Sequence, residues 1–569
     1  MASNTQNSPL LDHDIEVAVS ESRASSSPTT SRSSSTGGWR SALYLIAVGF
    51  AERFAFYGVS SNLITFLSGP LGQSTATAAV NVNTWSGAAS LLPLLGAAVA
   101  DSYLGRYRTI LLSTLLYILG LCLLTFSALL PSLSGSYCQE SSEFTSCYSQ
   151  LQVIFFFFSL YLVAFGQGGS RPCFQAFGAD QFDGQDPEEC KARSSFFNWW
   201  YFGICSGALV TRLVSSYIQD NVSWVMGFGL LCIVMILGLF VLLLGTRTYR
   251  YSIIGDGQSP LVRIVKVFVA AFRNWRTSST SEPRGNLHHP SSEQFKFLNK
   301  ALLAPDSDDL KEDMKLCTVF EVEEAKVVLS LVPIWSTCLV FAIVLAQMST
   351  FFTKQGATLD RSVMGGLNIP AASLQSFTSL IIILLIPFYD RVFVPMASAF
   401  TRKPSGITTL QRIGTGIFLS VISMVIAASV EKKRLKTAEK YALVDLPSVT
   451  IPMSVWWLVP QYLLIGVSDV FAMVGLQEFF YDQVPNELRS VGVALYISIF
   501  GAGNFLSSFL ISAIEQATGG TGRDSWFSNN LNRAHLDYFY CLLAGLSAVE
   551  LAVFMYFAKS YRYRSGGTI

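Results

Sequence analysis

The sequence contains few charged residues and no excess of either sign. Asp, Glu, Lys and Arg together make up 14% of its 569 residues, against roughly 25% in soluble domains. The 39 basic residues nearly balance the 38 acidic ones, which gives a formal net charge of +1. A nucleic-acid-binding protein would carry a basic excess, so this balance argues against that class. The low charge content argues against an ordinary soluble domain.

Reactive and metal-binding groups are also scarce. The sequence has four histidines, all outside the apolar runs described below or at the edge of one. No group of Cys and His has the spacing of a metal site, and no nucleophile–base set or phosphate-binding loop is present. We therefore expect a protein that is not an enzyme and uses no metal or cofactor. If protons cross a membrane through it, carboxylates must carry them.

Long hydrophobic runs, by contrast, dominate the chain, since 51% of its residues are hydrophobic. From residue 41 onward, runs of roughly 20 apolar residues recur, which is the length needed to cross a hydrocarbon core of about 30 Å. Buried helices of a soluble bundle would show polar faces that these runs lack. We count twelve runs, at 42–68, 78–100, 109–131, 151–175, 195–218, 223–245, 328–352, 371–392, 408–430, 453–480, 489–515 and 536–558.

The runs divide six and six around a long polar segment. We expect residues 39–245 and 328–558 to form two six-helix bundles of an all-α membrane protein, as in secondary transporters built from two halves. Residues 246–327 are expected to form a cytoplasmic central loop. Within it, residues 261–276 have the pattern of a basic amphipathic helix at the membrane interface, with a plain soluble helix as the alternative.

The two ends of the chain are polar. Residues 1–38 are rich in Ser and Thr and contain no apolar segment of a cleavable signal peptide. We expect residues 1–38 and 559–569 to form cytosolic tails, the first of them disordered. The stretch NSPLLDHD (7–14) contains a Leu-Leu pair without the usual upstream acidic residue. This stretch does not decide the location of the protein, which can be the plasma membrane or the vacuolar membrane.

Basic residues in the loops predict the orientation. An even number of spans puts both termini on one side, and most Lys/Arg-bearing loops fall on that side, which the positive-inside rule makes cytoplasmic. One strongly basic stretch, EKKRLKTAEK (431–440), disagrees because it falls on the other side. The polar loop that holds Cys138 and Cys147 also lies on the non-cytoplasmic side. These two cysteines can form a disulfide if that compartment is oxidising.

Charged residues inside the runs are the candidate functional groups, because each costs about 2.5–3.5 kcal/mol at the centre of a span. Glu52 and Arg53 lie in the first run, Arg171 in the fourth, and Asp469 and Glu478 in the tenth. A structural ion pair is the alternative for each, and we favour it for Glu478, which lies near the cytoplasmic end. Two arginines and two carboxylates would admit an anion once a proton neutralises one carboxylate.

Several motifs resemble one family. GAAVADSYLGRYRT (96–109) resembles the cytoplasmic loop motif of the major facilitator superfamily in the form found in proton-dependent oligopeptide transporters. FGADQFD (177–183), followed by FFNWWYFG (196–203), resembles the signature of that family's plant branch, the nitrate/peptide transporters. Further matching stretches are AQMSTFF (346–352), IPAASLQ to FYDR (369–391) and LQEFFYDQVP (476–485). The resemblance covers essentially all of the chain beyond residue 40.

The resemblance implies roles for particular residues. Glu52 and Asp469 would carry the proton. Arg53, Tyr57, Arg171 and Asn198 would contact the substrate. Arg171 would also pair with Asp469 as a gate between the two halves.

The loop motifs imply a second set of gating residues. Asp101 and Arg106 would pair at the cytoplasmic ends of the helices and latch the outward-open state. Asp390 and Arg391 are their counterparts in the second half. Asp180 and Asp183 are expected to organise the turn after the fourth span.

Three positions depart from the family pattern. Gly49 stands where the pattern Glu-x-x-Glu-Arg has its first Glu. Arg171 and Asp469 replace the Lys and Glu that the family often has. Leu345 occupies the position of a nitrate-contacting His in the dual-affinity nitrate carrier of the family.

The sequence therefore predicts a secondary transporter with the major facilitator fold and twelve transmembrane helices. Its expected solute is small and anionic or zwitterionic, such as nitrate, a di- or tripeptide or a related metabolite. Its other partners would be protons and the lipid bilayer. Two alternatives stay open: a proton-independent uniporter or exporter, motivated by Gly49, and a transport-deficient receptor.

Overall fold

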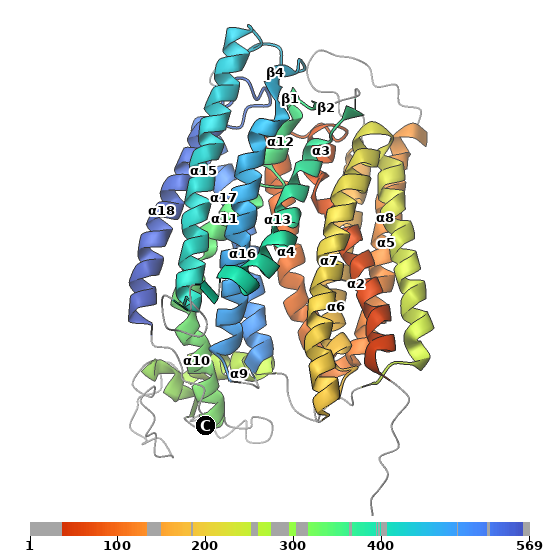
Figure 1. The fold of residues 1–569 in the computed structure, drawn as a ribbon, viewed down its shortest axis with the longest axis vertical. Coiled ribbons are helices and arrows are strands. Elements are labelled where there is room, and N and C mark those ends of the chain that lie inside the picture. The colour runs from red at the N-terminus through yellow and green to blue at the C-terminus, as the bar shows by residue number, and fades with distance from the viewer. Residues whose placement is uncertain are drawn as a thin grey trace, which may run out of the picture.

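The computed structural model describes most of the chain from residue 37 to residue 561 (Figure 1). The predicted tails lie almost entirely outside the described residues, and Cys138 and Cys147 lie outside them altogether. The described ranges are 37–133, 149–183, 186–251, 260–274, 295–302, 317–363, 367–393, 395–396, 399, 407–485, 488–519 and 524–561.

Long helices form the N-terminal half. Local capping fixes several of their starts: Ser149 and Gln152 form a capping box, and the Asp186 side chain accepts a hydrogen bond from the Glu188 backbone. The helices are α2 (Gly38–Ser60), α3 (Leu63–Ser68), α4 (Thr75–Val99), α5 (Arg106–Leu133), α6 (Gln150–Ala179), α7 (Pro187–Asn221) and α8 (Trp224–Leu244), with a π-helical turn η1 (Ala100–Leu104) after α4.

The C-terminal half repeats this arrangement with more interruptions. Its helices are α10 (Val319–Ser336), α11 (Leu339–Ala346), α12 (Phe351–Ala357), α13 (Ser376–Phe388), α15 (Thr409–Lys440), α16 (Val459–Asp482), α17 (Arg489–Thr518) and α18 (Leu536–Ser560). Three shorter turns belong to these spans: η7 (Ala371–Gln375), η8 (Tyr389–Phe393) and η9 (Val455–Leu458). The chain bends by 51° between α10 and the segment Leu339–Ala357.

Helices occupy all twelve predicted span positions. Among the described residues, ten are long and apolar enough to cross a membrane, and the bent pair makes an eleventh. The remaining predicted span, 195–218, lies within α7, a helix of 35 residues that is less apolar because it carries Arg212 and several hydroxyl side chains. The all-helical membrane fold predicted from the apolar runs is thus confirmed.

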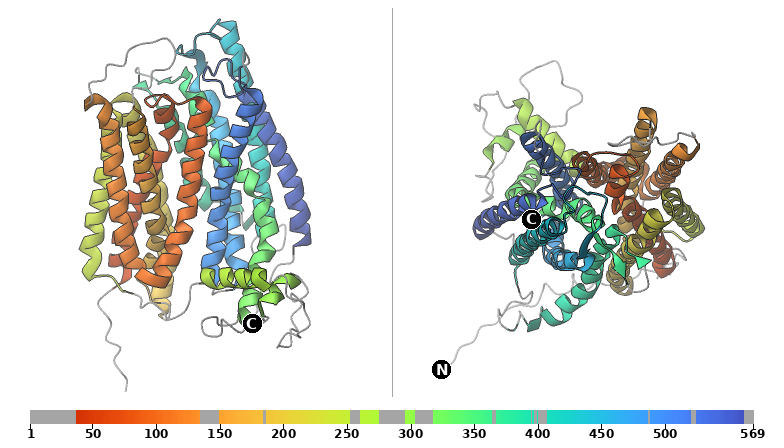
Figure 2. Two further views of the ribbon diagram at one scale, coloured as in Figure 1. Left: turned by 180° about the vertical axis from the view of Figure 1, so that it is seen from behind. Right: turned by 90° about the horizontal axis from the view of Figure 1, so that it is seen from above.

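The two halves lie side by side as two groups of helices (Figure 2). They meet chiefly where α4 packs against α17 and where α7 packs against α13. Helix α2 begins and α18 ends at the same end of the bundle, at the bottom of Figure 1. We call this the terminal end and the opposite one the distal end.

Two small strand pairs lie at the distal end. Strand β1 (Leu359–Asp360) pairs in parallel with β4 (Ile451–Ser454), and β2 (Ser362–Val363) pairs antiparallel with β3 (Leu367–Asn368). The β1–β4 pair ties the connection before η7 to the connection before η9, and the β2–β3 pair lies within the first of these connections (Figure 1).

The basic stretch 431–440 belongs to α15 and is not a loop. Within it, Arg434 is completely buried and forms an ion pair with Glu431, with 2.6 Å between Nη2 and Oε1. Lys433 lies over the ring of Trp457 at 3.1 Å. Arg434 is therefore neutralised within the helical bundle, whereas Lys433 is exposed, so one of the basic residues of this stretch loses its value as an orientation signal.

The helix α9 (Pro260–Arg273) crosses the terminal end roughly at right angles to the long helices (Figure 2). One face packs against the C-terminal half through Ile264, Val267 and Ala271. A second apolar face is exposed and includes Val265 (58% exposed), Val269 (61%) and Phe272 (80%). The predicted helix in the central segment is present, and its position at a membrane interface stays a prediction.

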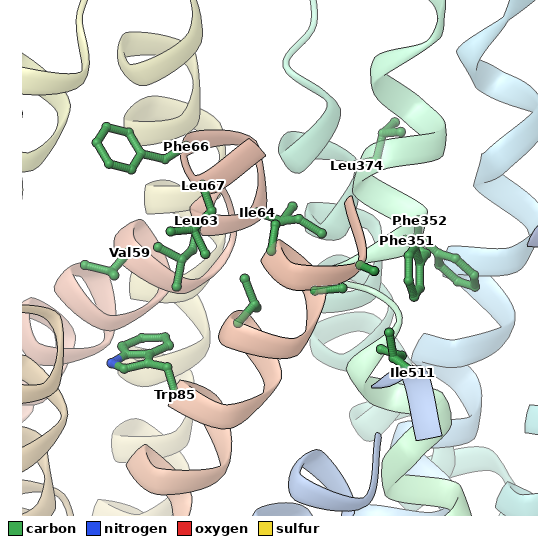
Figure 3. Close-up of a cluster of buried hydrophobic side chains, with 14 of the residues drawn as sticks. Val59, Leu63, Ile64, Phe66, Leu67, Trp85, Phe351, Phe352, Leu374 and Ile511 are labelled. Carbon is green, nitrogen blue, oxygen red and sulfur yellow. The ribbon is translucent and has the colours of Figure 1, made fainter. Parts of the chain in front are cut away.

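A hydrophobic core joins the two halves near the distal end. Figure 3 shows Ile64, Phe66 and Trp85 of the N-terminal half in the same cluster as Phe351 and Ile511 of the C-terminal half. All five are fully buried. The halves are thus closed upon each other by apolar packing at this end.

Candidate functional site

The paired charges in the first span bind each other. The Arg53 guanidinium donates through Nε to Glu52 Oε2 at 2.5 Å and through Nη2 to Oε1 at 2.6 Å. Both side chains are buried, and the guanidinium lies 5.3 Å from the centre of the Phe56 ring. This two-point pairing engages both carboxylate oxygens, so Glu52 has little capacity left for another partner.

Gly49, which breaks the family pattern, allows close packing of α2 against α7. A Cβ atom at Gly49 would lie 2.6 Å from Cη2 and 2.7 Å from Cζ3 of Trp200. The indole is itself buried, so it has little room to move. A glutamate at this position would therefore collide with Trp200 before its carboxylate could take part in coupling.

We predict that Gly49→Ala alone lowers the thermal stability of the purified protein, because one methyl group overpacks this contact. Overpacking of this kind typically costs about 1–3 kcal/mol. The double variant Gly49→Ala/Trp200→Leu should recover part of the loss. Gly545→Ala is the matched control, since a Cβ there meets no atom within 4 Å. Equal melting temperatures for Gly49→Ala and Gly545→Ala would contradict this packing role.

Charged and phenolic groups from both halves meet between the bundles. Arg171 on α6 interacts electrostatically with Tyr57 and Glu52 on α2 and with Tyr496 on α17. Tyr496 in turn interacts with Asp469 on α16. The predicted residues Glu52, Arg53, Tyr57, Arg171 and Asp469 are therefore brought into one neighbourhood. The side chain of Asn198 lies outside the described part of α7.

The predicted Arg171–Asp469 ion pair is absent among the described residues. The basic side chain that interacts with Asp469 is Arg212, and Tyr496 is within electrostatic range of both Asp469 and Arg171. Asp469 Oδ1 is buried and has no hydrogen-bond partner in the described structure. A pairing of Arg171 with Asp469 would require a conformation other than this one.

Arg212 on α7 is the residue that sequence reasoning missed. Its Nη1 donates to Ser379 Oγ at 2.6 Å and to the Gln375 carbonyl at 3.2 Å, both in the C-terminal half. The guanidinium also lies over the ring of Tyr57 at 4.5 Å. None of its described partners is a carboxylate within ion-pair distance. The cost of a charge within predicted span 195–218 was the signal that could have identified it.

Hydrogen bonds and ion pairs between described residues of the two halves all lie toward the distal end. Besides those of Arg212, they include Gln375 Nε2 to the Ser61 carbonyl at 3.0 Å and Lys354 Nζ to Ser68 Oγ at 2.9 Å. We call this set the distal seam. Its other members are the pairs Thr75–Asn529, Asn83–Ser507, Thr84–Ser508, Val80–Ser508, Arg212–Ser373 and Asp220–Arg361. The structure is thus closed at its distal end.

The loop residues predicted to gate the terminal end are only partly described. Arg106 forms an ion pair with Asp180 at the end of α6, so the turn after the fourth span is tied to the loop motif. The side chains of Asp101 and Asp390 lie outside the described residues. Arg391 in η8 is exposed. The Asp101–Arg106 latch stays a prediction.

Among the described residues, no group of three or more His, Cys, Asp or Glu side chains could hold a metal ion. The described part of this neighbourhood offers fixed guanidinium charges, phenolic hydroxyls and one carboxylate without a bidentate partner. Such a set can bind a charged solute and exchange a proton.

Comparison with known proteins identifies the family. Residues 107–527 match the sequence pattern of the POT family, PTR2. The Arabidopsis thaliana protein NRT1/PTR FAMILY 5.10 is 64% identical over 533 residues, which cover 93% of this chain and 94% of that protein. NRT1/PTR FAMILY 5.12 from the same plant is 57% identical over 538 residues, 94% of each chain.

Solved structures of low sequence identity share the fold. An auto-inhibited POT family peptide transporter superposes with a TM-score of 0.67 at 20% identity and covers 93% of this chain and 99% of its own. The POT family transporter PepTSo gives a TM-score of 0.64 at 20% identity, with 92% and 98% covered. The resemblance predicted from the motifs is confirmed, and the chain belongs to the POT family of membrane transporters, with relatives in the plant NRT1/PTR family.

Proposed function

We propose that this transporter moves a small anionic or zwitterionic solute by alternating access, and that a proton bound at Asp469 accompanies it. In this scheme the two halves rock about the neighbourhood of Arg171, Tyr57 and Tyr496. The distal seam supports the scheme, because a structure closed at one end is one of the two states that alternating access requires.

The charge balance between the halves is the observation that carries the proposal. Arg53, Arg171 and Arg212 face two carboxylates, Glu52 and Asp469, which leaves a formal excess of one positive charge. Because Arg53 and Glu52 neutralise each other, Arg171 and Arg212 remain against Asp469 alone. Guanidinium groups bind planar oxyanions with two hydrogen bonds, so a carboxylate or nitrate matches this site.

Proton coupling would follow from the state of Asp469. A carboxylate oxygen buried without a hydrogen-bond partner is unfavourable, and a proton or a cation would relieve that cost. In the opposite conformation we propose that Arg171 supplies the cation, as the predicted gate requires. A solute bound between Arg171 and Asp469 would then take part in the same change of partner at Asp469.

Orientation and location complete the proposal. The terminal end carries most of the basic loops, so we place it in the cytosol. The protein would act in the plasma membrane or the vacuolar membrane. Neither placement affects the chemistry of the central residues.

Uptake into proteoliposomes with a panel of labelled anions and peptides tests the proposal. We expect Arg171→Gln to weaken binding of the transported solute roughly tenfold to a hundredfold, the loss of one charge-assisted hydrogen-bonded contact. Arg412→Gln is the matched control, because Arg412 lies near the terminal end, where it pairs with Glu478 at 3.4 Å. Equal uptake by the two variants would contradict the role of Arg171. An absence of uptake for every solute in the panel would favour the receptor alternative.

A further inference from the structure

A polar hollow opens at the distal end, outside the central site. Its volume is about 200 Å³, which is ample for a small hydrated anion. Helix α12, the segment before β4 and the segment before α18 enclose it. Its polar lining consists of Lys354, Thr358, Ser448, Thr450, Asn529 and Asn532.

Lys354 brings an uncompensated positive charge to this hollow. Its Nζ donates one hydrogen bond, to Ser68 Oγ at 2.9 Å, whereas an ammonium group has three donors. No carboxylate of the described residues lies within ion-pair distance of it, and none lines the hollow. The nearby Arg434 does not need a further counter-ion, because it is paired with Glu431.

The remaining polar groups of the lining also favour an anion. Asn529 uses its carbonyl oxygen to accept from the Thr75 backbone at 2.9 Å, which leaves its amide hydrogens without a described partner. Asn532 Oδ1 and Thr358 Oγ1 already accept from Arg434. These two acceptors are therefore engaged, while donors of Lys354 and Asn529 stay available and the Ser448 and Thr450 hydroxyls can also donate. A cation would meet the Lys354 ammonium and no carboxylate of the lining, whereas hard cations are bound chiefly by carboxylate and carbonyl oxygens.

We propose that this hollow is a binding site for a small anion, held by Lys354 Nζ and the Asn529 amide. The site is separate from the central residues and does not depend on their proposed role. The ligand is defined by its chemistry, a monovalent oxyanion or halide of the size of nitrate, acetate or chloride.

The two residues that would hold the anion also join the halves. Lys354 bonds Ser68 and Asn529 bonds Thr75, so both contacts belong to the distal seam. In this closed structure Ser68 and Thr75 of the N-terminal half hold Lys354 and Asn529 in place beside the hollow, so the site is complete only while the distal end is closed. By linkage, the bound anion stabilises the distal-closed state.

Thermal unfolding of the purified full-length protein tests the site without transport. We use an Arg171→Gln background to weaken the central site, and nitrate, acetate or chloride as probes at constant ionic strength set with the bulky anion gluconate. We expect a saturable rise of the melting temperature. Lys354→Met should weaken the apparent affinity roughly tenfold or more, as expected for loss of a charge-assisted contact.

Matched variants separate a site from a general effect of charge. Lys436→Met removes the same charge from an exposed position near the distal end of α15 and should leave the shift unchanged, while Lys354→Arg should retain it. Should Lys354→Met not fold, Asn529→Asp serves instead, because it keeps the acceptor for Thr75 and introduces a repelling charge. An equal anion response in Lys354→Met and Lys436→Met, or no saturable response at all, would overturn the proposal. Either result leaves the uptake test of Arg171 unaffected.

Discussion

Asp469→Asn is expected to abolish accumulation driven by a proton gradient while preserving exchange of labelled for unlabelled solute. Asparagine has nearly the same shape as aspartate, but its amide cannot take up and release a proton near neutral pH. Asp469 is the carboxylate of the central neighbourhood that lacks a bidentate arginine, and one of its oxygens has no described hydrogen-bond partner. The measurement is uptake into proteoliposomes with and without an imposed pH gradient, beside a counterflow assay.

Two further variants define the result. Glu478→Gln, on the same helix, is the control, because Glu478 is 45% exposed and pairs with Arg412; it should remain driven by the gradient. Glu52→Gln should instead reduce the yield of folded protein, since it leaves Arg53 buried without its partner. If Asp469→Asn still accumulates solute along the gradient, the proton is carried elsewhere. Uptake by the unmodified protein that ignores the gradient would favour the uniporter alternative.

Arg434→Met is expected to lower the free energy of unfolding by about 3–5 kcal/mol, the loss typical of a broken buried ion pair. The side chains of Arg434 and Glu431 are both 0% exposed. Arg434 also donates to the Leu531 carbonyl at 2.6 Å and to Asn532 Oδ1 at 2.9 Å. Its removal leaves a buried carboxylate without a counter-ion and releases the segment before α18. Thermal unfolding in detergent measures the effect.

The double variant Glu431→Leu/Arg434→Met should recover part of this loss, because it removes the stranded charge as well. Recovery should be incomplete, since Gln355 Nε2 then loses its bond to Glu431 Oε2. Arg533→Met, which breaks exposed ion pairs with Asp445 and Asp524 at the same end, should change stability little. A melting temperature of Arg434→Met close to that of Arg533→Met would show that the buried pair is dispensable.

The sequence predicted the architecture well because membrane spans are set by length and apolar content. Every predicted run coincides with a helix, and the motifs identified the family. The stretch 431–440 shows the limit of this reasoning. Its many charged residues are typical of a loop. Arg434 is nevertheless buried, because it pairs with Glu431 three residues earlier and donates to the carbonyl of Leu531, almost a hundred residues later.

The central residues were predicted better than their pairings. Glu52, Arg53, Arg171 and Asp469 all lie in the predicted neighbourhood, because charges in spans are rare and point to the interior. Which charge faces which depends on the conformation and on side chains from other helices. In this conformation Asp469 interacts electrostatically with Arg212 and forms no ion pair with Arg171, and the local sequence around these residues does not predict which charge faces which.

The apolar core that joins the halves near the distal end has a thermal consequence. Opening that end must separate or repack side chains such as Ile64 and Phe351, which are now fully buried. Exposure of apolar surface raises the heat capacity, and the gain from burying it weakens on cooling. The balance between the two access states therefore depends on temperature through the difference between the apolar surface exposed at the distal end and the apolar surface buried as the terminal end closes. A membrane in a chilled cell would hold a different mixture of inward- and outward-facing carriers even at constant solute and proton concentrations.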